Sequence, residues 1–378
     1  MKLALVHDWL KEIGGAERVL IELHKIFPEA PIYTLFYNKE FVREYLPNAD
    51  IRASFLQKIP FISKFYMLFV WLMPVAIESF DLSEFERVIS SSAIFSKGLV
   101  LKPSTKHICY CYSPTRFLWD WHAEYNKDKE LSWPALIFQH LLRLWDRSSA
   151  DRVDQFVAIS KVVQARIKKY YRRDSVVIYP SVRNLTHDSP HKKSADFFAL
   201  ARLPASVRSS KGSDSSPHDY YLIVSRLYKY KNIDIAIEAF NKLGYQLMII
   251  GDGPDRERLE NMAGPTIKLL GSKSDEVLAE YYSSCRAFVM PQEEDFGLTP
   301  IEAMSFGKPV VALRRGGAIE TIIEGETGEF FDDPIPEALA DAVRRLNENY
   351  ESYDSEAIKV QANKFSSEVF KQSILNLL

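Results

Sequence analysis

Short apolar runs alternate along the chain with segments in which apolar residues recur every three or four positions. The runs are β-prone and about five residues long, as is typical of strands buried on both faces of a parallel sheet. The intervening segments have the period of helices that bury one face. This alternation predicts an α/β fold with a doubly wound parallel sheet in each half. Expected strands cover residues 3–7, 88–91, 107–111, 155–159 and 176–179, and then 221–224, 246–250, 267–270, 287–291 and 308–313, with a turn and a short strand over 325–331.

The alternation stops between residues 183 and 219, where Ser, Lys, His and Pro accumulate. Such a composition without periodicity is typical of a linker, and this one is longer than most connections. With 378 residues the chain is long enough for two domains of ordinary size. We therefore expect an N-terminal domain over 1–182, a linker or insertion over 183–219, and a C-terminal domain over 220–378 whose last helix packs back on the N-terminal domain.

The most apolar run, residues 65–77, allows two interpretations. At 13 residues it is too short to span a bilayer. It is either a buried helix or an element that dips into one leaflet beside Lys58 and Lys64. The buried interpretation is favoured because apolar helices usually face a core, and the interfacial alternative stays open.

Composition narrows the classes of function. Lys plus Arg number 48 against 50 Asp plus Glu, a balance that argues against a dedicated nucleic-acid binder. Three cysteines give no disulfide framework and no paired metal motif, so a reducing cytoplasmic compartment is the default. The N-terminus shows no signal-peptide pattern, and no stretch has the roughly 18 apolar residues that a membrane span needs.

The strongest candidate for chemistry is the stretch from Glu294 to Glu302, which follows the strand at 287–291. We expect a turn at Gly297, an N-cap at Thr299, and a short helix that Gly307 ends. Two carboxylates then lie at the carboxyl end of a parallel strand, where open α/β sheets bind ligands, beside a helix N-terminus suited to anions. A nucleotide sugar carries both phosphates and hydroxyls. Two plainer interpretations stay open: Glu302 closes a capping box with Thr299, and Glu294 is a solvated loop acid.

Other strand ends converge on the same edge. Arg226 and Lys231 follow the strand at 221–224, and two cations at one strand end suit a diphosphate. Glycine turns follow at Gly251–Gly253, Gly271 and Gly316–Gly317. Because no Asp-x-Asp occurs at a buried strand end, we expect no metal and no other cofactor. In the first half, Gly14 and Gly15 after the first strand mark a tight turn or a close approach to a ligand.

These segments together resemble the retaining glycosyltransferases of the GT-B fold, sequence family 4. The similarity lies in the Glu294-to-Glu302 spacing, residues 225–232, 251–254, Gly14-Gly15 and 178–180, and it covers nearly the whole chain except the linker. The closest resemblance is to bacterial mannosyltransferases of surface-polysaccharide or lipid-linked glycan assembly. It implies two facing Rossmann-like domains with a cleft between them, the donor on the C-terminal domain and the acceptor mostly on the N-terminal one.

The resemblance also implies roles for residues. Glu294 would bind the donor hexose, and Arg226 and Lys231 would hold the diphosphate and stabilise the departing nucleotide. Glu302 would bind the ribose. The remaining donor-side candidates are Phe296, Gly297, Leu298, Gly253, Gly15 and Gly14, and the acceptor-side candidates are Tyr112, Arg116 and Asp120.

Two positions depart from the family pattern. Asp295 stands where Gly is commonest, and Tyr112 stands where similar proteins have His. A tyrosine, with a pKa of about 10, is a poor base at neutral pH. The departure at Tyr112 puts in doubt a histidine near the acceptor hydroxyl.

The leading hypothesis is a metal-independent, retaining transfer of a hexose to a lipid-linked or glycan acceptor, with mannose from GDP-mannose as the expected donor. The alternatives are a UDP-sugar-dependent transferase and a catalytically weak, sugar-nucleotide-binding subunit that scaffolds a membrane glycan assembly complex. A nucleotide-sugar epimerase is disfavoured, because acid/base carboxylates for it are not identified in the N-terminal half. We expect a cytoplasmic protein, with peripheral association at the inner face of the membrane as a further hypothesis. The nucleotide, hexose, linkage, acceptor and oligomeric state stay open.

Overall fold

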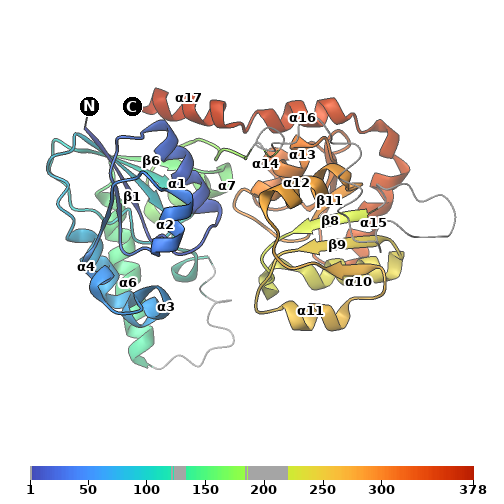
Figure 1. The fold of residues 1–378 in the computed structure, drawn as a ribbon, viewed down its shortest axis with the longest axis horizontal. Coiled ribbons are helices and arrows are strands. Elements are labelled where there is room, and N and C mark those ends of the chain that lie inside the picture. The colour runs from blue at the N-terminus through green and yellow to red at the C-terminus, as the bar shows by residue number, and fades with distance from the viewer. Residues whose placement is uncertain (1, 121, 123–132, 184, 186–219) are drawn as a thin grey trace. The chain divides into compact units, whose positions relative to one another are not determined.

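The computed structural model describes residues 2–120, 122, 133–183, 185 and 220–378. It divides into two compact units, Met1–Ser181 with Phe370–Leu378, and Val182–Val369 (Figure 1). Apart from residues 183 and 185, the predicted linker lies outside the described residues.

The first unit is built on a seven-stranded parallel sheet. Its strands are β1 (Leu3–His7), β2 (Ile32–Thr34), β3 (Ile51–Ala53), β4 (Arg87–Ser92), β5 (Lys106–Cys111), β6 (Gln155–Ala158) and β7 (Ser175–Val177), in the order β3-β2-β1-β4-β5-β6-β7. β1 is buried along its whole length, as expected of a strand covered on both faces. The order changes direction between β1 and β4, and ligands of such sheets bind outside the carboxyl ends at that point.

Helices and short 3-10 turns connect these strands. They are α1 (Gly15–Ile26), α2 (Lys39–Tyr45), η1 (Phe55–Lys58), α3 (Ile62–Phe65), η2 (Tyr66–Leu72), α4 (Met73–Glu78), η3 (Arg116–Leu118), α6 (Trp133–Asp151), α7 (Lys161–Arg166) and η4 (Ile167–Tyr171). α1 follows β1 directly and buries Val19, Leu20 and Leu23, the face that its periodicity predicts.

The second unit has a six-stranded parallel sheet in the order β10-β9-β8-β11-β12-β13. Its strands are β8 (Tyr220–Val224), β9 (Gln246–Ile250), β10 (Ile267–Leu269), β11 (Ala287–Met290), β12 (Val310–Leu313) and β13 (Gly328–Phe331). The helices are α10 (Ile233–Leu243), α11 (Arg256–Met262), α12 (Asp275–Ser284), α13 (Leu298–Ser305), α14 (Ala318–Thr321), α15 (Pro336–Glu348) and α16 (Ser355–Asn363), with η5 (Lys229–Lys231) and η6 (Tyr350–Ser352). The last helix, α17 (Ser367–Leu377), begins in this unit and continues into the first. The change of direction in this sheet lies between β8 and β11.

Residues 65–77 do not form one buried helix. They divide into the end of α3, the 3-10 helix η2 and most of α4. η2 has no buried residue, whereas α4 buries Met73, Ala76 and Ile77. The buried interpretation therefore holds for the second part of this run only.

The predicted N-cap at Thr299 is wrong. Gly297 is the N-cap of α13, with φ of 88°, a conformation that glycine adopts without steric cost. Gly307 ends this helix in the left-handed conformation, with φ of 71°, as expected.

Candidate functional site

The candidate site of the second unit lies at the carboxyl ends of β8 and β11, which pair side by side. The segment after β8 leads through η5 to Lys231, and the segment after β11 leads to Glu294. The Lys231 ammonium donates to Glu294 Oε1, and Gln292 Nε2 donates to the same oxygen at 3.1 Å. Lys231 is buried and Glu294 is partly exposed. The structure thus brings together two of the three predicted catalytic side chains.

Arg226, the third, lies apart from that contact. Its guanidinium carbon is 5.7 Å from the centre of the Tyr228 ring, and Tyr228 stacks on Tyr230 with 5.7 Å between ring centres. Lys231 Nζ lies 5.0 Å from the Tyr230 ring. Both cations therefore border the same pair of tyrosines, and Arg226 is exposed to solvent.

Glycines allow the segments around this site to pack closely against one another. A Cβ on Gly317 would lie 2.4 Å from Phe296 Cα, and a Cβ on Gly253 would lie 2.3 Å from the carbonyl oxygen of Leu227. The Gly317 N–H donates to the Glu294 carbonyl at 2.9 Å. These contacts hold the Glu294-to-Gly297 segment in place before α13, where the first N–H groups of the helix, including that of Leu298, have no partner within the helix.

Glu302 is 2% exposed, and its carboxylate is bound on both oxygens. Arg183 Nε donates to Oε1 at 2.9 Å, and the Tyr282 hydroxyl donates to Oε2 at 2.9 Å. Arg183 also pairs with Asp275. The capping-box interpretation of Glu302 is therefore wrong, because its carboxylate binds these side chains.

Burial and neighbouring carboxylates determine the pKa values of Tyr282 and Arg183, and so the protonation state of each side chain. Burial, with the Glu302 charge adding to it, raises the pKa of Tyr282 well above its usual range, so its hydroxyl stays a donor. Burial alone would lower the pKa of Arg183, but Glu302 and Asp275 outweigh burial and raise it. The sequence assigned Arg183 to the linker and did not single out Tyr282, and no local motif marks their contact with Glu302.

In the first unit, Tyr112 belongs to a chain of hydroxyls at the carboxyl ends of β1 and β4. Its hydroxyl donates to the Ala16 carbonyl at 2.9 Å, so Ser91 Oγ donates to Tyr112 Oη at 2.7 Å. His7 Nδ1 then donates to Ser91 Oγ at 3.0 Å, which leaves His7 Nε2 facing Glu17 Oε1 at 3.5 Å. Sequence reasoning missed His7 and Glu17, although both flank the predicted turn.

The turn before α1 brings its two predicted residues to this chain. Gly14 is the N-cap of α1, and a Cβ there would lie 2.7 Å from Glu17 Oε2. Gly15 is the first residue of the helix. Gly14 and Gly15 thus belong to the first unit, whereas the other predicted donor residues belong to the second.

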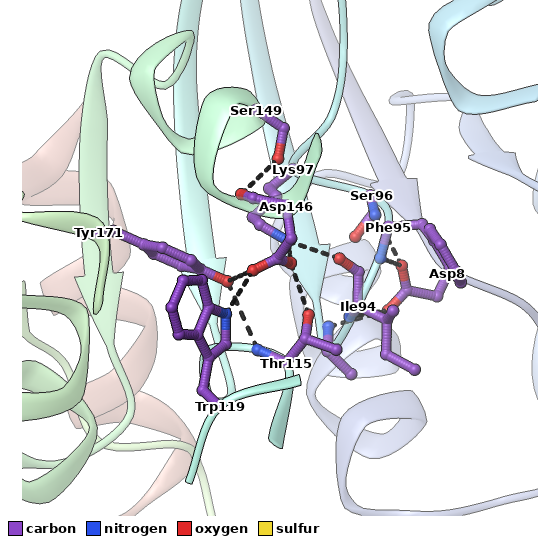
Figure 2. Close-up of polar contacts among 11 residues, drawn as sticks. Asp8, Ile94, Phe95, Ser96, Lys97, Thr115, Trp119, Asp146, Ser149 and Tyr171 are labelled. Carbon is purple, nitrogen blue, oxygen red and sulfur yellow. Dashed lines mark hydrogen bonds and ion pairs between the residues drawn. The ribbon is translucent and has the colours of Figure 1, made fainter. Parts of the chain in front are cut away.

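Burial raises the pKa of Tyr112 well above 10, and the charges of Glu17 and Asp8 add to the shift while the bond from Ser91 opposes it. Asp8 is itself fixed: its carboxylate accepts four backbone N–H bonds of 2.6–2.9 Å from residues 93–96 (Figure 2). A tyrosine in these surroundings keeps its proton. Tyr112 therefore orients neighbours by hydrogen bonds and does not serve as a base.

The other acceptor-side candidates lie in a second cluster. Asp120 Oδ2 is 3.8 Å from Arg116 Nε and 3.1 Å from Arg166 Nε. The structure places Arg116 and Asp120 near each other and adds Arg166, whereas Tyr112 belongs to the separate chain of hydroxyls.

A buried ion pair supports the loop that carries Thr115 and Trp119. The Asp146 carboxylate accepts bonds from Lys97 Nζ at 2.6 Å, Thr115 Oγ1 at 2.7 Å, Trp119 Nε1 at 2.7 Å and the Tyr171 hydroxyl at 2.9 Å (Figure 2). With all four partners present, the buried charge is satisfied.

Within the described residues, no group of three or more His, Cys, Asp or Glu side chains is placed to hold a metal. Cys109, Cys111 and Cys285 are buried and free, and burial raises the pKa of Cys285 to about 12. No helix in the described part of the chain is long and apolar enough to cross a membrane.

The two sheets and their topology place the chain in the GT-B class of folds, as predicted. Anabaena HepE, solved in complex with UDP, is 18% identical and matches with a TM-score of 0.72 over 100% of this chain and 99% of that chain. Residues 209–362, less than half of the chain, match the family model described as Glycosyl transferases group 1. The matched residues lie within the second unit.

Curated relatives of this sequence are also named as glycosyltransferases. An uncharacterized glycosyltransferase of Methanocaldococcus jannaschii is 26% identical over 57% of this chain, and the chain spans 57% of that relative's length. The alpha-1,3/1,6-mannosyltransferase ALG2 of Candida glabrata is 22% identical over 98% of this chain and 91% of its own.

Proposed function

We propose that this protein is a retaining glycosyltransferase that moves a hexose from a nucleotide sugar to a lipid-linked or glycan acceptor. The observation that carries the proposal is the contact between Lys231 and Glu294 where β8 and β11 end, beside the glycine-opened start of α13. A cation, a carboxylate and free N–H groups together match the diphosphate and the hydroxyls of such a donor.

Each donor-site group has a role in this proposal. The Lys231 ammonium has three donor hydrogens, so it can keep Glu294 and still donate to a phosphate. Glu294 binds hexose hydroxyls, and Arg226 closes on the diphosphate from its exposed position. Glu302, oriented by Arg183 and Tyr282, offers its carboxylate to the ribose.

The proposed transfer proceeds on the donor's own face, with the departing phosphate stabilised by Lys231, Arg226 and backbone N–H groups and without a metal. On the acceptor side we place Tyr112, Arg116 and Asp120. Tyr112 holds the hydroxyl chain that ends at His7, and the His7–Glu17 pair is the group positioned there to take a proton.

GDP-mannose is the proposed donor because a relative that matches almost the whole chain is a mannosyltransferase. A UDP-sugar is the second candidate, since the matching Anabaena HepE was solved with UDP and with UDP-glucose. The proposed location is cytoplasmic, with peripheral binding to the inner face of the membrane.

The first experiment is a thermal-shift panel of GDP, UDP, ADP and CDP, because the nucleotide that binds the folded state stabilises it by mass action. Transfer is then measured with the matching donor and a lipid extract. NMR of the product shows whether the anomeric configuration is retained.

Glu294→Gln and Lys231→Ala should each reduce transfer about a hundredfold, as expected when a transition-state contact is lost. The matched control is the exposed pair Lys242–Glu337, which lies on the surface of the same unit. Lys242→Ala should leave the rate unchanged. Full activity of both site variants would disprove the assignment, and donor binding with neither hydrolysis nor transfer would favour the scaffold alternative.

A further inference from the structure

The first unit exposes many large apolar side chains on two segments. In the segment from η1 to α4, Phe61 is 77% exposed, Leu68 70% and Trp71 57%. Monomeric proteins rarely expose large apolar side chains in contiguous groups, and such groups mark interaction sites. Together with further exposed residues of both segments, these define the apolar face: Phe55, Phe61, Phe65, Met67, Leu68, Trp71 and Val75, and Trp133, Leu136, Ile137, Leu141 and Leu144 of α6.

Between residues 133 and 146, α6 exposes large apolar side chains while it buries polar ones. It buries Gln139 and Asp146, both of which have side-chain partners, together with Leu142, and exposes Leu136, Leu141 and Leu144. A helix that faces water normally has the opposite arrangement. Packing among the described residues of this unit therefore does not account for the exposed leucines.

The two segments belong to one region of the first unit. Met73 and Ile77 of α4 and Leu142 of α6 are buried in the same hydrophobic core. Glu78, at the end of α4, accepts a bond from Trp145 Nε1 at 2.8 Å, which joins the two helices directly. Figure 1 shows α3, α4 and α6 gathered in one part of this unit.

The charged residues within 53–77 and 133–145 have one sign, and the acids that follow them, Glu78 and Asp146, are paired with Arg152 and Lys97. Residues 53–77 contain Lys58 and Lys64 and no acid, and residues 133–145 contain Arg143 and no acid. Both lysines are exposed, and Lys64 Nζ lies 5.6 Å from the Phe65 ring. Lysines beside exposed aromatic rings are typical of proteins that lie in the membrane interface.

The charges also indicate which of two partners covers the apolar face, a second copy of this chain or a membrane. A second copy of this chain on the same face would bring Lys58 and Lys64 against the partner's like charges, and residues 53–77 and 133–145 offer no carboxylate to pair them. A leaflet with anionic lipids supplies both a layer for the apolar side chains and phosphates for the lysines.

We propose that the apolar face is a membrane-docking surface, with Phe61, Leu68 and Trp71 entering the boundary of headgroups and acyl chains and Lys58 and Lys64 binding anionic headgroups. This surface would bind the protein to the membrane at the proposed peripheral location. Its action does not depend on the donor site or on the transfer reaction. Its test therefore needs no nucleotide sugar, and either proposal can fail alone.

The experiment is co-sedimentation of the full chain with vesicles of phosphatidylcholine alone and of phosphatidylcholine mixed with phosphatidylglycerol. We expect binding to the mixed vesicles that weakens with added salt. Trp71→Ser combined with Leu68→Ser should weaken that binding at least tenfold, since each buried side chain of this size contributes about a factor of ten or more.

Lys58→Glu combined with Lys64→Glu should abolish the preference for mixed vesicles. The matched control is Val360→Ser combined with Ile335→Ser, which removes two exposed apolar side chains from the second unit, where Val360 is 64% exposed. This control should bind as the wild type does. Because all of these side chains are exposed, the thermal unfolding of every variant should match that of the wild type.

A second readout locates the surface. Brominated lipid should quench tryptophan fluorescence in the wild type, and Trp71→Phe combined with Trp133→Phe should remove the quenching while vesicle binding persists. Two results would overturn the inference. The first is vesicle binding by the Trp71/Leu68 variant that equals binding by the wild type. The second is a wild type that binds no vesicles and forms a dimer, when the Trp71/Leu68 variant does not form that dimer.

Discussion

Glu302 shows how one residue depends on a partner far away in the chain. Arg183 lies 119 positions before it and supplies the cation beside a carboxylate that is almost completely buried. A buried charge without its partner is strongly destabilising.

Arg183→Met should therefore lower the free energy of unfolding of the second unit by about 3 kcal/mol. Adding Glu302→Gln should restore most of that loss, because the unpaired charge is then removed. Calorimetry of the single and double variants checks this. Arg256→Met, which breaks an exposed cluster with Asp252 and Glu260, is the control and should change little. Equal losses in the single and double variants would contradict the interpretation.

Tyr112 gives a prediction on pH dependence. Because burial raises its pKa, the hydroxyl is protonated throughout the neutral range and well above it. Tyr112→Phe should therefore leave the limbs of the pH–rate profile of transfer in place. The rate itself should fall modestly, since one hydrogen bond of the chain to His7 is lost. A limb that disappears in this variant would identify Tyr112 as a titrating group.

For single residues, the sequence predicts a position when the segment that contains the residue determines that position. Glu294 and Lys231 lie in the segments that follow two neighbouring strands, so the strand ends are enough to place them together. Arg183 could not be predicted in the same way, because its contact with Glu302 depends on how a segment after the last strand of the first unit packs on α13. His7 is the last residue of a fully buried apolar strand, and that position by itself indicates only burial.

At the scale of elements, β5 contains a histidine that should make stability depend on pH. His107 is buried, its Nε2 lies 2.8 Å from Ser90 Oγ, and burial lowers its pKa to about 4 from an ordinary 6.5. Since the folded-state pKa is the lower one, protons bind preferentially to the unfolded chain. The stability that neutral His107 contributes is complete above pH 6.5 and is lost as the pH falls toward 4.

The expected loss across that range is about 3 kcal/mol. Thermal unfolding from pH 7 to pH 4 measures it. His107→Gln should flatten this dependence, whereas His140→Gln, on an exposed part of α6, should not. An unchanged slope in the His107 variant would show that carboxylates account for the acid sensitivity.

The sequence predicted the longer strands and helices well and missed three short elements. β2 and β3 have three residues each, and α2 has seven. Periodicity cannot distinguish three residues from a loop, and only pairing with β1 makes Ile32–Thr34 a strand. The prediction of a buried helix at residues 65–77 was wrong in part for another reason. Apolar composition indicates that a segment contacts other apolar groups, but it does not indicate whether those groups belong to the protein's own core.

For the whole molecule, the alternation of strands and helices was sufficient to predict the fold class, because few topologies bury parallel strands on both faces. From the sequence we expect the last helix to pack back on the N-terminal domain, but the sequence does not indicate where along α17 the chain passes from one unit to the other. Phe370 and Ile374 are buried, and the Phe370 ring meets Tyr110 of β5 edge-on, with 5.8 Å between ring centres.

Phe370→Ala should therefore destabilise the first unit by about 3–5 kcal/mol, as expected for a fully buried aromatic side chain. The control is the neighbouring Val369→Ala, whose side chain is half-exposed and whose effect should be within about 0.5 kcal/mol. Thermal unfolding of both variants measures the difference. Similar melting temperatures for the two would show that α17 contributes nothing to the core of the first unit.

The division of the chain also has a consequence for its synthesis. The first unit is translated before the second, yet it includes Phe370–Leu378, which follow the second unit in the chain. Its hydrophobic core therefore stays incomplete until the whole second unit has been made. Loss of these nine residues would damage the half of the protein that was synthesised first.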